Sequence, residues 1–574
     1  MLKKNAPLRI AAAVLFVLAM TIAARLFSRF AFQINDDFYI SRLAAGIETG
    51  IPEDKLYFCG AVFSKALWLL YSISASVPWY SLILEGSLFF VSVFVLCKFL
   101  KKAEKKWEIA TVFFCFGIYW LFFVMPQMIS LSFFVVPAAM CCAAILHYYC
   151  ESGKIGTYIV SFLLLFAAVE IRREAAVMAI PFAGMAFLGK VLPVIREKKV
   201  VIANFCFAMA CGLVFVVHIF LWNMAYGSPE WKEYAAYTKA RSALFDYCIL
   251  PDYSEETKEI YESAGISESE LKILTEDNHL TFNTEFDADT IQMLRSAFGD
   301  TLNAEKPSLP ECFLTAAGRK VKEIPTLSGL IVLVYGWLLY GAVRNRGQRK
   351  RRLAELASAY AVSLLAWMVC VYRGRILERV SVSLYYFELS LLLGLVLAYA
   401  GQEREEKEEK RKRLVFCLGS VCIALLFGLG YLKWKRDCNS GMLDWASADY
   451  RELAGYMGEH EDNFYYLDIS MVSTLTKEVF EEQDVNVNQA LMGGWLPRTP
   501  YYHEKYEQYG LGGVKEDLLK PNVFLVFQGE DSEVKERLLA YLYEQDMRMV
   551  FETKDIVKTE VGTVFEIVGI ADGG

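Results

Sequence analysis

Long apolar stretches dominate the pattern of hydrophobic and polar positions along this chain. Each runs for about 20 residues with few charges, the length at which an α-helix crosses the hydrocarbon core of a bilayer. We read eleven of them as membrane-spanning helices. They cover residues 8–29, 79–98, 108–125, 128–149, 155–170, 174–194, 200–222, 325–343, 353–371, 380–400 and 414–432. The sequence therefore predicts a polytopic α-helical membrane protein, which excludes a soluble enzyme, a secreted disulfide scaffold and a disordered chain.

One more apolar segment, 57–73, is predicted to lie in the membrane interface rather than to cross the bilayer. Lys65 stands at its centre, and its apolar residues recur at the spacing of an amphipathic helix. With this segment kept outside, all strongly basic short loops fall on one side, which the positive-inside rule assigns to the cytoplasm. These loops are 98–106, 190–199, 344–352 and 403–413. The N-terminus is then cytoplasmic and the C-terminus extracytoplasmic, in a multi-pass protein of the cell membrane.

This topology predicts a transmembrane domain over 1–432 and an extracytoplasmic domain over 433–574. Within the first, residues 30–78 form an outer loop and residues 223–323 an outer insertion that is mostly helical. The C-terminal domain reads as a small α/β unit. Its expected elements are strands at 464–469 and 523–527, an amphipathic helix at 532–547, and a hairpin of 549–553 with 563–569.

The charge of the chain follows the same division. The 574 residues are 55% hydrophobic and 22% charged, with a net charge of −7. Residues 224–323 hold 19 acidic and 10 basic side chains, and residues 433–574 hold 27 and 14. These two outer segments thus carry −22 and the rest of the chain +15. An acidic exterior disfavours nucleic acid as a partner.

Several common chemistries have no support in the sequence. There is no P-loop, no glycine-rich dinucleotide motif after a strand, no GxSxG and no CxxC pair. The five His are scattered, which disfavours a His-based metal cage. Cys248 and Cys312 share the outer insertion and could form a disulfide.

The sharpest candidate site is Asn35-Asp36-Asp37, a few residues past the first span. Two adjacent carboxylates at the outer membrane face could supply a general base for an acceptor hydroxyl, or hold a divalent cation against a phosphate. The alternative is structural. Asn35 or Asp36 would cap a helix over 37–48, with Asp37 at its positive end.

Two arginine-containing outer turns are candidates for phosphate recognition, for which guanidinium groups are suited. Arg172 and Arg173 stand between Glu170 and Glu174, so this turn could instead be internally paired. The second turn contains Arg373 and Arg375 and runs on to Arg379; three outer arginines depart from the positive-inside trend. Glu85 and Glu388, both within predicted spans, are expected to pair with basic neighbours.

The beginning of the chain resembles the GT-C superfamily of membrane glycosyltransferases, which includes protein mannosyltransferases and the aminoarabinose transferase of lipid A. The resemblance rests on the acidic pair Asp36-Asp37 after the first span, the Ala-Gly-rich segment Leu43–Gly50, the turn at Pro52, the interfacial segment 57–73, and the next span opening at Pro78. It covers about the first 130 residues and is architectural afterwards. Two features depart from the family: paired prolines after the first-loop helix are absent, and the acidic pair is Asp-Asp where Asp-Glu is common.

The resemblance implies a GT-C-like bundle of about eleven spans that takes a sugar from a polyprenyl-phosphate-linked donor, with inversion, to a cell-envelope glycan, lipid or protein at the outer face. Asp36 or Asp37 would then be the base or a metal contact. Arg172, Arg173, Arg373 and Arg375 would be ligands of the donor phosphate. No cofactor is implied beyond a possible divalent cation. The alternatives are a polymerase or ligase of lipid-linked glycans, and a transporter or flippase; against the latter, we find no inverted repeat.

Overall fold

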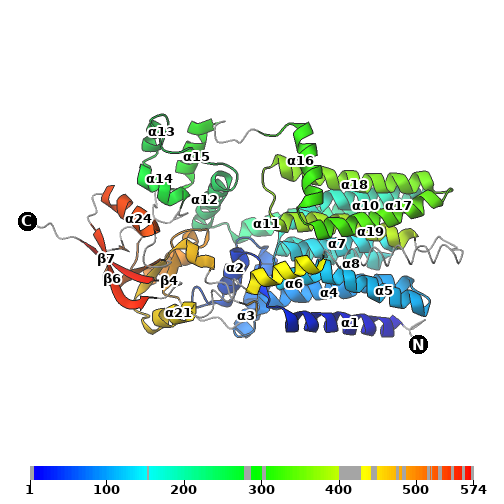
Figure 1. The fold of residues 1–574 in the computed structure, drawn as a ribbon, viewed down its shortest axis with the longest axis horizontal. Coiled ribbons are helices and arrows are strands. Elements are labelled where there is room, and N and C mark those ends of the chain that lie inside the picture. The colour runs from blue at the N-terminus through cyan, green and yellow to red at the C-terminus, as the bar shows by residue number, and fades with distance from the viewer. Residues whose placement is uncertain are drawn as a thin grey trace, which may run out of the picture.

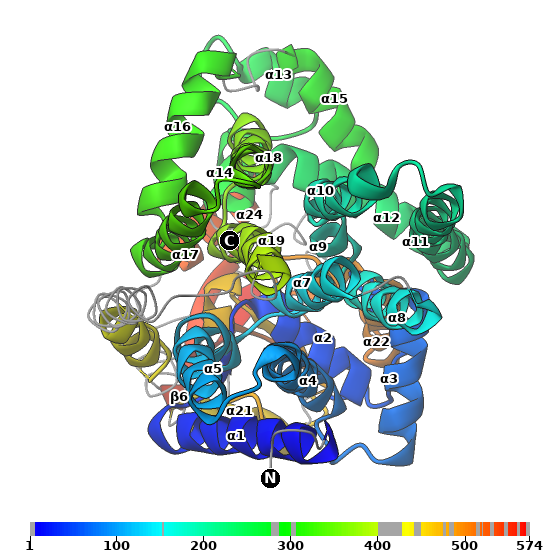
Figure 2. The same cartoon turned by 90° about the vertical axis from the view of Figure 1, so that its right-hand side faces the viewer.

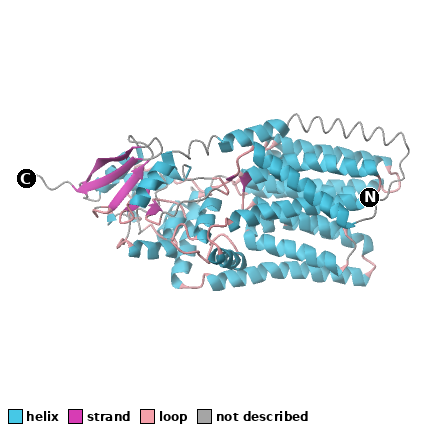
Figure 3. Ribbon diagram, turned by 90° about the horizontal axis from the view of Figure 1, so that it is seen from below, coloured by secondary structure: helices cyan, strands magenta, loops and turns pink. Residues whose placement is uncertain are grey.

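The computed structural model describes most of the chain. The described residues are 6–151, 154–276, 286–299, 306–399, 428–440, 449–473, 478–480, 487–512, 517–518, 520–527, 533–544, 549–558 and 563–569. They form an elongated molecule, with a helical bundle that holds the N-terminal end of the chain and a sheet-containing part at the opposite end (Figures 1 and 3). The division into domains at residue 432 stays a prediction.

Seven helical segments among the described residues are long and apolar enough to cross a membrane. They are α1 (Ala6–Phe27), α4 (Trp79–Lys102), the continuous run Lys106–Ile129 formed by α5, η1 and α6, α11 (Lys198–Ala225), α17 (Pro325–Arg344), α18 (Arg349–Tyr372) and α19 (Glu378–Tyr399). Shorter apolar helices run beside them: α7 (Val135–Cys150), α8 (Ile155–Ile171), α9 (Arg173–Met178) and α10 (Ile180–Val191). Figure 2 shows most of these helices end-on, and α19 lies at the centre, most of its residues buried. The prediction of a multi-pass helical membrane protein is confirmed.

Ten of the eleven predicted spans are helical, with one difference at a boundary. The span predicted from residue 128 begins only at Val135, because Ser130 and Leu131 form strand β2 (Ser130–Leu131). The eleventh, 414–432, lies outside the described residues except for its last part, where residues 428–440 are helical. The basic loop 403–413 also lies outside the described residues.

The segment predicted to be interfacial forms α3 (Ala61–Ile73). Its 13 residues reach about 20 Å, which is less than the hydrocarbon thickness of a bilayer. The carboxylate of Glu170, at the end of α8, accepts hydrogen bonds from the backbone N–H groups of Val62 (2.9 Å) and Phe63 (3.3 Å) and so caps α3. Gly60 permits this approach, since a Cβ there would lie 2.3 Å from Glu170 Oε2.

The outer insertion is helical, as predicted. It comprises α12 (Pro229–Phe245), α13 (Lys258–Ser263), α14 (Glu268–Thr275), α15 (Ala288–Phe298) and α16 (Leu309–Lys322). Helices α12 to α15 share a small hydrophobic core of their own around Leu244, Tyr261 and Leu294. The expected disulfide is absent: Cys248 and Cys312 are both free thiols.

The C-terminal part contains the predicted α/β unit. The order of its five-stranded sheet is β4-β3-β5-β7-β6, in which β3 is parallel to β4 and β5 while β7 is antiparallel to β5 and β6. The strands are β3 (Phe464–Leu467), β4 (Gln489–Leu491), β5 (Val523–Phe527), β6 (Met549–Lys558) and β7 (Thr563–Gly569), and the helices are α21 (Asp449–Glu459), η4 (Ile469–Ser473), η5 (Leu496–Arg498), α22 (Pro500–Gln508) and α24 (Glu533–Glu544). Both expected strands, the helix and the hairpin are present.

Buried polar groups join this unit to the first outer loop. Arg42 and Glu48 form an ion pair whose side chains are both almost fully buried. The hydroxyl of Tyr502, on α22, donates to Glu48 Oε2 at 2.6 Å. Burial by itself would raise the pKa of Glu48, but the cations of Arg42 and Lys505 and the Tyr502 hydrogen bond lower it overall. Two buried cations around one ionised carboxylate therefore fix the first loop against α22.

The two acidic residues predicted inside spans have basic partners. Glu85 pairs with Arg25 of α1 at 2.8 Å. Glu388, fully buried in α19, pairs with Lys320 of α16 at 2.6 Å and also accepts from Ser363 and Tyr335. Both charges are thus compensated within the protein, as a low-dielectric environment requires.

Candidate active site

The acidic pair lies where the first outer loop meets the connection between α6 and α7. Strand β1 (Ala31–Phe32) pairs in parallel with β2, and the N–H of Gln33 donates to the carbonyl of Leu131 at 2.7 Å. Helix α2 (Asn35–Ala45) begins two residues later, so Asp36 and Asp37 fall in its first turn, where the helix dipole favours negative charge. The β1–β2 pairing thereby fixes the position of both carboxylates.

The expected capping role is wrong. The helix covers 35–45 rather than 37–48, its N-cap is Ile34, and no side chain makes a cap hydrogen bond there. It ends at Gly46, whose φ of +78° suits glycine and where a Cβ would meet backbone atoms of Ile51 at 2.5 Å. The carboxylates of Asp36 and Asp37 are therefore directed to other groups.

Asp37 is fully buried and held on one side only. Its Oδ1 accepts hydrogen bonds from the hydroxyl of Tyr80 (2.7 Å) and from the backbone N–H of Phe133 (2.8 Å). Its Oδ2 has no hydrogen-bond partner among the described residues. Burial raises the pKa of Asp37 to about 8, although the two hydrogen bonds and the charge of Arg379 lower it and the charge of Asp36 adds to the increase. The carboxyl group therefore titrates close to neutral pH.

Asp36 is held by the C-terminal unit. The indole N–H of Trp495, just before η5, donates to Asp36 Oδ1 at 2.9 Å. Consecutive residues of a helix point about 100° apart, so the two neighbouring carboxylates face different partners. The pair is thus one buried carboxyl group on the membrane side and one half-buried carboxylate on the side of the α/β unit.

Arg172 is linked to both carboxylates through three aromatic side chains. Its guanidinium lies over the ring of Phe133 (4.8 Å to the centroid) and over that of Phe58 (5.1 Å), and it donates to the Phe58 carbonyl at 3.2 Å. The ring of Trp495 meets the ring of Phe58 edge-on at 5.0 Å. Arg172 and the acidic pair therefore border one site, which the three rings partly enclose.

The rest of the second predicted cluster is internally paired. Glu174 forms ion pairs at 3.0 Å with both Arg172 and Arg173. Glu170 caps α3 and also contacts His218. The distance from Glu170 Oε1 to His218 Nδ1 is 2.9 Å. Arg173 is partly exposed and pairs with Glu174, with no contact to the acidic pair among the described residues, so of the two arginines Arg172 is the one that borders the site.

The arginines of the second predicted turn, Arg373, Arg375 and Arg379, also have different surroundings. Arg375 forms an ion pair with Asp246, at the end of α12, at 2.6 Å. Arg373 is exposed at the end of α18. Arg379, in the first turn of α19, interacts electrostatically with Asp36, Asp37, Arg172 and Arg375, and it forms no ion pair with any described carboxylate. Arg379 is therefore the half-buried cation of the site that is available to an anionic ligand.

Sequence reasoning did not identify three residues of this site: Tyr80, Phe133 and Trp495. Arg379 was recognised as the third arginine of the outer turn, but Arg373 and Arg375 were chosen as the candidate phosphate ligands. Tyr80, Phe133 and Trp495 reach the acidic pair from distant parts of the chain, and no local pattern marks them.

The site offers little to a metal ion on its own. No group of three or more His, Cys, Asp and Glu side chains converges within the described part of the chain. The acidic pair supplies two carboxylates, and one oxygen of each already accepts a hydrogen bond. A divalent cation here would need further oxygen ligands from a phosphate and water, as Mg²⁺ often takes.

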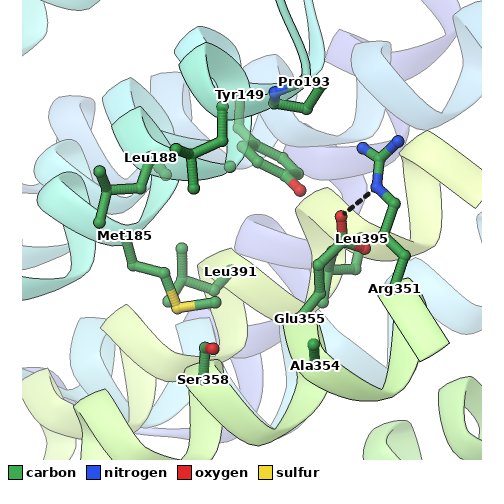
Figure 4. Close-up of a pocket in the computed structure, with 13 residues that line it drawn as sticks. Tyr149, Met185, Leu188, Pro193, Arg351, Ala354, Glu355, Ser358, Leu391 and Leu395 are labelled. Carbon is green, nitrogen blue, oxygen red and sulfur yellow. Dashed lines mark hydrogen bonds and ion pairs between the residues drawn. The ribbon is translucent and has the colours of Figure 1, made fainter. Parts of the chain in front are cut away.

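Two apolar cavities lie within the bundle. One of about 370 Å³ runs between α7, α8, α10 and α11, lined by small side chains such as Ala176, Ala179, Ala183 and Gly212. It begins one turn beyond Arg173. The other, of about 460 Å³, lies between α7, α10, α18 and α19 with the Arg351–Glu355 ion pair at its edge (Figure 4). Arg351 is at the opposite end of α18 from Arg373, so the polar edge of this second cavity lies at the other end of the bundle from the arginine-containing turn.

Comparison with known proteins returns structural neighbours only. No protein-family model matches the chain, and no curated protein matches it. Among solved structures, it is similar to ArnT from Cupriavidus metallidurans bound to undecaprenyl phosphate, at 11% identity over 97% of this chain and 98% of that one, with a TM-score of 0.36.

It is also similar to the oligosaccharyltransferase of Archaeoglobus fulgidus in the apo form, at 12% identity over 99% of this chain and 75% of that one, with a TM-score of 0.44. Both neighbours are GT-C glycosyltransferases, the superfamily that the first-loop motif resembles. With TM-scores below 0.5, neither an activity nor the role of a residue follows from this likeness.

Proposed function

We propose that this chain is an integral-membrane, inverting glycosyltransferase that moves a sugar from a polyprenyl-phosphate-linked donor to a cell-envelope glycan, lipid or protein at the outer face of the membrane. The observation that carries this proposal is Asp37: a buried carboxyl group fixed through Oδ1, with Oδ2 lacking a partner and an unpaired arginine within electrostatic range.

Asp37 has the properties of a general base. A catalytic base works best when its pKa lies near the operating pH, and burial raises the pKa of Asp37 to about 8. In the reaction, the acceptor oxygen forms a bond to C1 of the sugar while the bond from C1 to the phosphate oxygen breaks. The acceptor proton passes to Asp37 Oδ2, and the electron pair of the broken bond leaves with the phosphate.

Positive charge near the leaving phosphate is the second requirement. Arg379 is the unpaired cation beside the acidic pair, and Arg172 lies across Phe133 from Asp37. Guanidinium groups bind phosphate oxygens strongly and stabilise the charge that develops as the bond to the sugar breaks. Arg375 and Arg173 are already engaged with Asp246 and Glu174, so we assign them a supporting electrostatic role.

The apolar part of the donor also has a place to bind. The cavity that begins beyond Arg173 is lined almost wholly by apolar and small side chains and lies among membrane helices. A polyprenyl chain can lie there while its phosphate remains at the arginines. This arrangement separates an apolar tail from an anionic head, which is the chemistry of a lipid-linked donor.

Asp36 acts beside the base. Its hydrogen bond to Trp495 holds its carboxylate in place, and its negative charge raises the pKa of Asp37. The alternative role is that Asp36 and Asp37 hold a divalent cation together with the donor phosphate. Removing divalent cations with a chelator separates the two roles, because activity persists in the chelator if the pair acts only by proton transfer and charge.

The proposal is tested by extracting lipids from cells that lack this protein. We expect a polyprenyl-phosphate sugar to accumulate and the corresponding envelope modification to disappear, and both to be restored by the wild-type chain. An unchanged lipid profile together with an unchanged envelope would contradict the proposal. Loss of transport of a soluble solute without any change in lipids would favour the transporter alternative.

A further inference from the structure

A polar cleft of about 700 Å³ separates the outer insertion from the α/β unit. We call it the insertion cleft. Its walls are α12 and the start of α15 on one side, and η5 and α22 on the other. Its volume lies in the range of small-molecule binding sites and suits a short oligosaccharide. In Figure 1, helices α12 to α15 of the insertion lie above the α/β unit at the left of the molecule.

Three tyrosines that line the cleft have buried hydroxyl groups without a hydrogen-bond partner among the described residues. These are Tyr234 and Tyr237 of α12, which are 3% and 4% exposed, and Tyr506 of α22. Helices α12 and α22 form opposite walls of the cleft. Buried hydroxyls are normally paired, so unsatisfied ones on both walls of a cleft call for an explanation, and a polar ligand that completes their hydrogen bonds is one.

The charge of the cleft selects against anions. Five carboxylates line it, against one guanidinium. The acidic residues are Glu230, Glu233, Asp287, Asp289 and Glu507. The guanidinium, that of Arg498, is already held by the carbonyl of Phe286 at 3.0 Å and by the ring of Tyr237 at 4.2 Å. A ligand with positive charge is therefore favoured, and a phosphate or anionic polymer is repelled.

The carboxylates do not form a metal site, since none of the described acidic groups converge in threes. The carboxylates are spread along the walls of the cleft. They therefore suit an organic ligand that has several separated positive charges and hydroxyl groups between them. An oligosaccharide that bears amino groups has this chemistry, and the tyrosine hydroxyls provide both donors and acceptors for its hydroxyl groups.

The cleft is also connected to the acidic pair. Trp495, which donates to Asp36, directly precedes η5, and Pro497 and Arg498 of η5 line the cleft. Three residues of a 3₁₀-helix span about 6 Å, so one short rigid segment borders both places. The segment from Trp495 to Arg498 therefore links the cleft to Asp36.

We infer that the insertion cleft binds an amine-bearing oligosaccharide, and that this saccharide is the acceptor. Its designation as acceptor rests on the proposed function, whereas its binding does not. The inference gives the insertion a role: α12 and α15 select the acceptor by charge, while Tyr237 and Tyr506 pair with its hydroxyls.

The test is direct binding of two matched probes to the purified full-length protein in detergent at pH 6. One is a tetramer of glucosamine, the other the same tetramer fully N-acetylated, so that only the amino charge differs. We expect the glucosamine tetramer to bind at least about tenfold more tightly. Equal affinity for the two, or binding of neither, would overturn the inference.

Variants locate the binding. Tyr237→Phe should weaken binding of the glucosamine tetramer about tenfold without lowering the melting temperature, because the hydroxyl it removes has no partner among the described residues. Tyr261→Phe is the matched control: Tyr261 lies in the same insertion outside the cleft and its hydroxyl donates to the Pro251 carbonyl at 2.6 Å. This control should lower the melting temperature and leave affinity unchanged.

Charge is tested by the pair Glu233→Gln with Glu507→Gln, which should weaken binding about tenfold. Glu255→Gln with Glu256→Gln removes the same charge from the insertion outside the cleft and should have no effect. If the Tyr237 or the Glu233 and Glu507 variants bind like wild type, the inference fails. Asp37→Asn should bind the tetramer normally, so a failure of catalysis and a failure of this site are distinguishable.

Discussion

The indole N–H of Trp495 donates to the carboxylate of Asp36 across 459 positions of sequence, at 2.9 Å. The α/β unit thus contributes a residue to the site that the first outer loop begins. Trp495 also touches Phe58, which lies under the guanidinium of Arg172. The unit is therefore part of the candidate site rather than an independent appendage.

Trp495→Phe tests this link. The substitution keeps an aromatic ring against Phe58 and removes the hydrogen bond to Asp36. We expect kcat to fall about tenfold, the value of one hydrogen bond to a charged group, with little change in KM for the donor. Activity is measured with membranes and the lipid accumulated by the deletion strain as donor. Trp107→Phe, at an exposed position of α5, is the control and should behave like wild type. A Trp495 variant with full kcat would contradict the positioning role.

The pH dependence of transfer should report Asp37. Because the base must be ionised and its pKa is raised to about 8, activity should rise about tenfold per pH unit below 8 and level off above it. Tyr80→Phe removes a hydrogen bond that lowers this pKa, so the inflection should move to higher pH. Tyr71→Phe, whose hydroxyl accepts from the Tyr80 backbone and not from Asp37, should leave the inflection in place. A flat profile between pH 6 and 8 would exclude Asp37 as the base.

Stability should depend on pH through the same group. The pKa of Asp37 is raised from 3.8 to about 8 on folding, so between these values the folded chain holds a proton that the unfolded chain releases. The free energy of unfolding therefore falls as the pH rises through this window. We expect the melting temperature of the wild type to decrease from pH 5 to pH 8, and that of Asp37→Asn to decrease less. Identical slopes for the two proteins would contradict a buried, protonated Asp37.

Arg379 should bind the donor phosphate. Arg379→Gln should raise KM for the donor about 10- to 100-fold, because it removes charge-assisted hydrogen bonds to the phosphate. It should also move the pH inflection upward, since the charge of Arg379 lowers the pKa of Asp37. Arg373→Gln, four residues outside the helix start and exposed, is the matched control. Equal effects of the two substitutions on KM would show that Arg379 does not bind the donor phosphate.

The sidedness of the membrane domain can be measured by thiol labelling. In Lys102→Cys, the new thiol should react with a membrane-impermeant maleimide only after the cells are permeabilised. The natural Cys438 is exposed in the helix 428–440 and should react in intact cells. Labelling of residue 102 from outside would mean that 57–73 crosses the membrane.

Much of the fold could be predicted from local patterns. Apolar runs of the right length identified the helices of the bundle. Alternating or periodic apolar residues identified β3, β5 and α24. Each of these elements buries a face, and that face shows in the sequence as apolar residues at the spacing of a strand or helix. The start of α7 was misplaced since the pairing of β1 with β2 interrupts the apolar run, and that pairing joins residues about 100 positions apart.

The site was predictable only in part. Asp36 and Asp37 were found because paired carboxylates at a membrane surface are unusual, and Arg172 because guanidinium groups there are too. Their different roles could not be separated, since these depend on which neighbour each side chain meets. Tyr80 and Trp495 decide this, and both reach the pair through tertiary packing. Glu170 was read as part of a charged turn, whereas it caps α3, which only the fold brings near.

The most direct test of the central claim compares two substitutions in the same outer loop. Asp37→Asn keeps the shape of the buried side chain but removes the base, while Asp54→Asn removes a carboxylate that pairs with Lys65 on an exposed surface. Each variant is expressed in the deletion strain, its amount and melting temperature are checked, and the lipids are analysed by mass spectrometry. We expect the Asp37 variant to accumulate the polyprenyl-phosphate sugar as the deletion does, and the Asp54 variant to match wild type. A well-folded Asp37→Asn protein with a wild-type lipid profile would contradict the account.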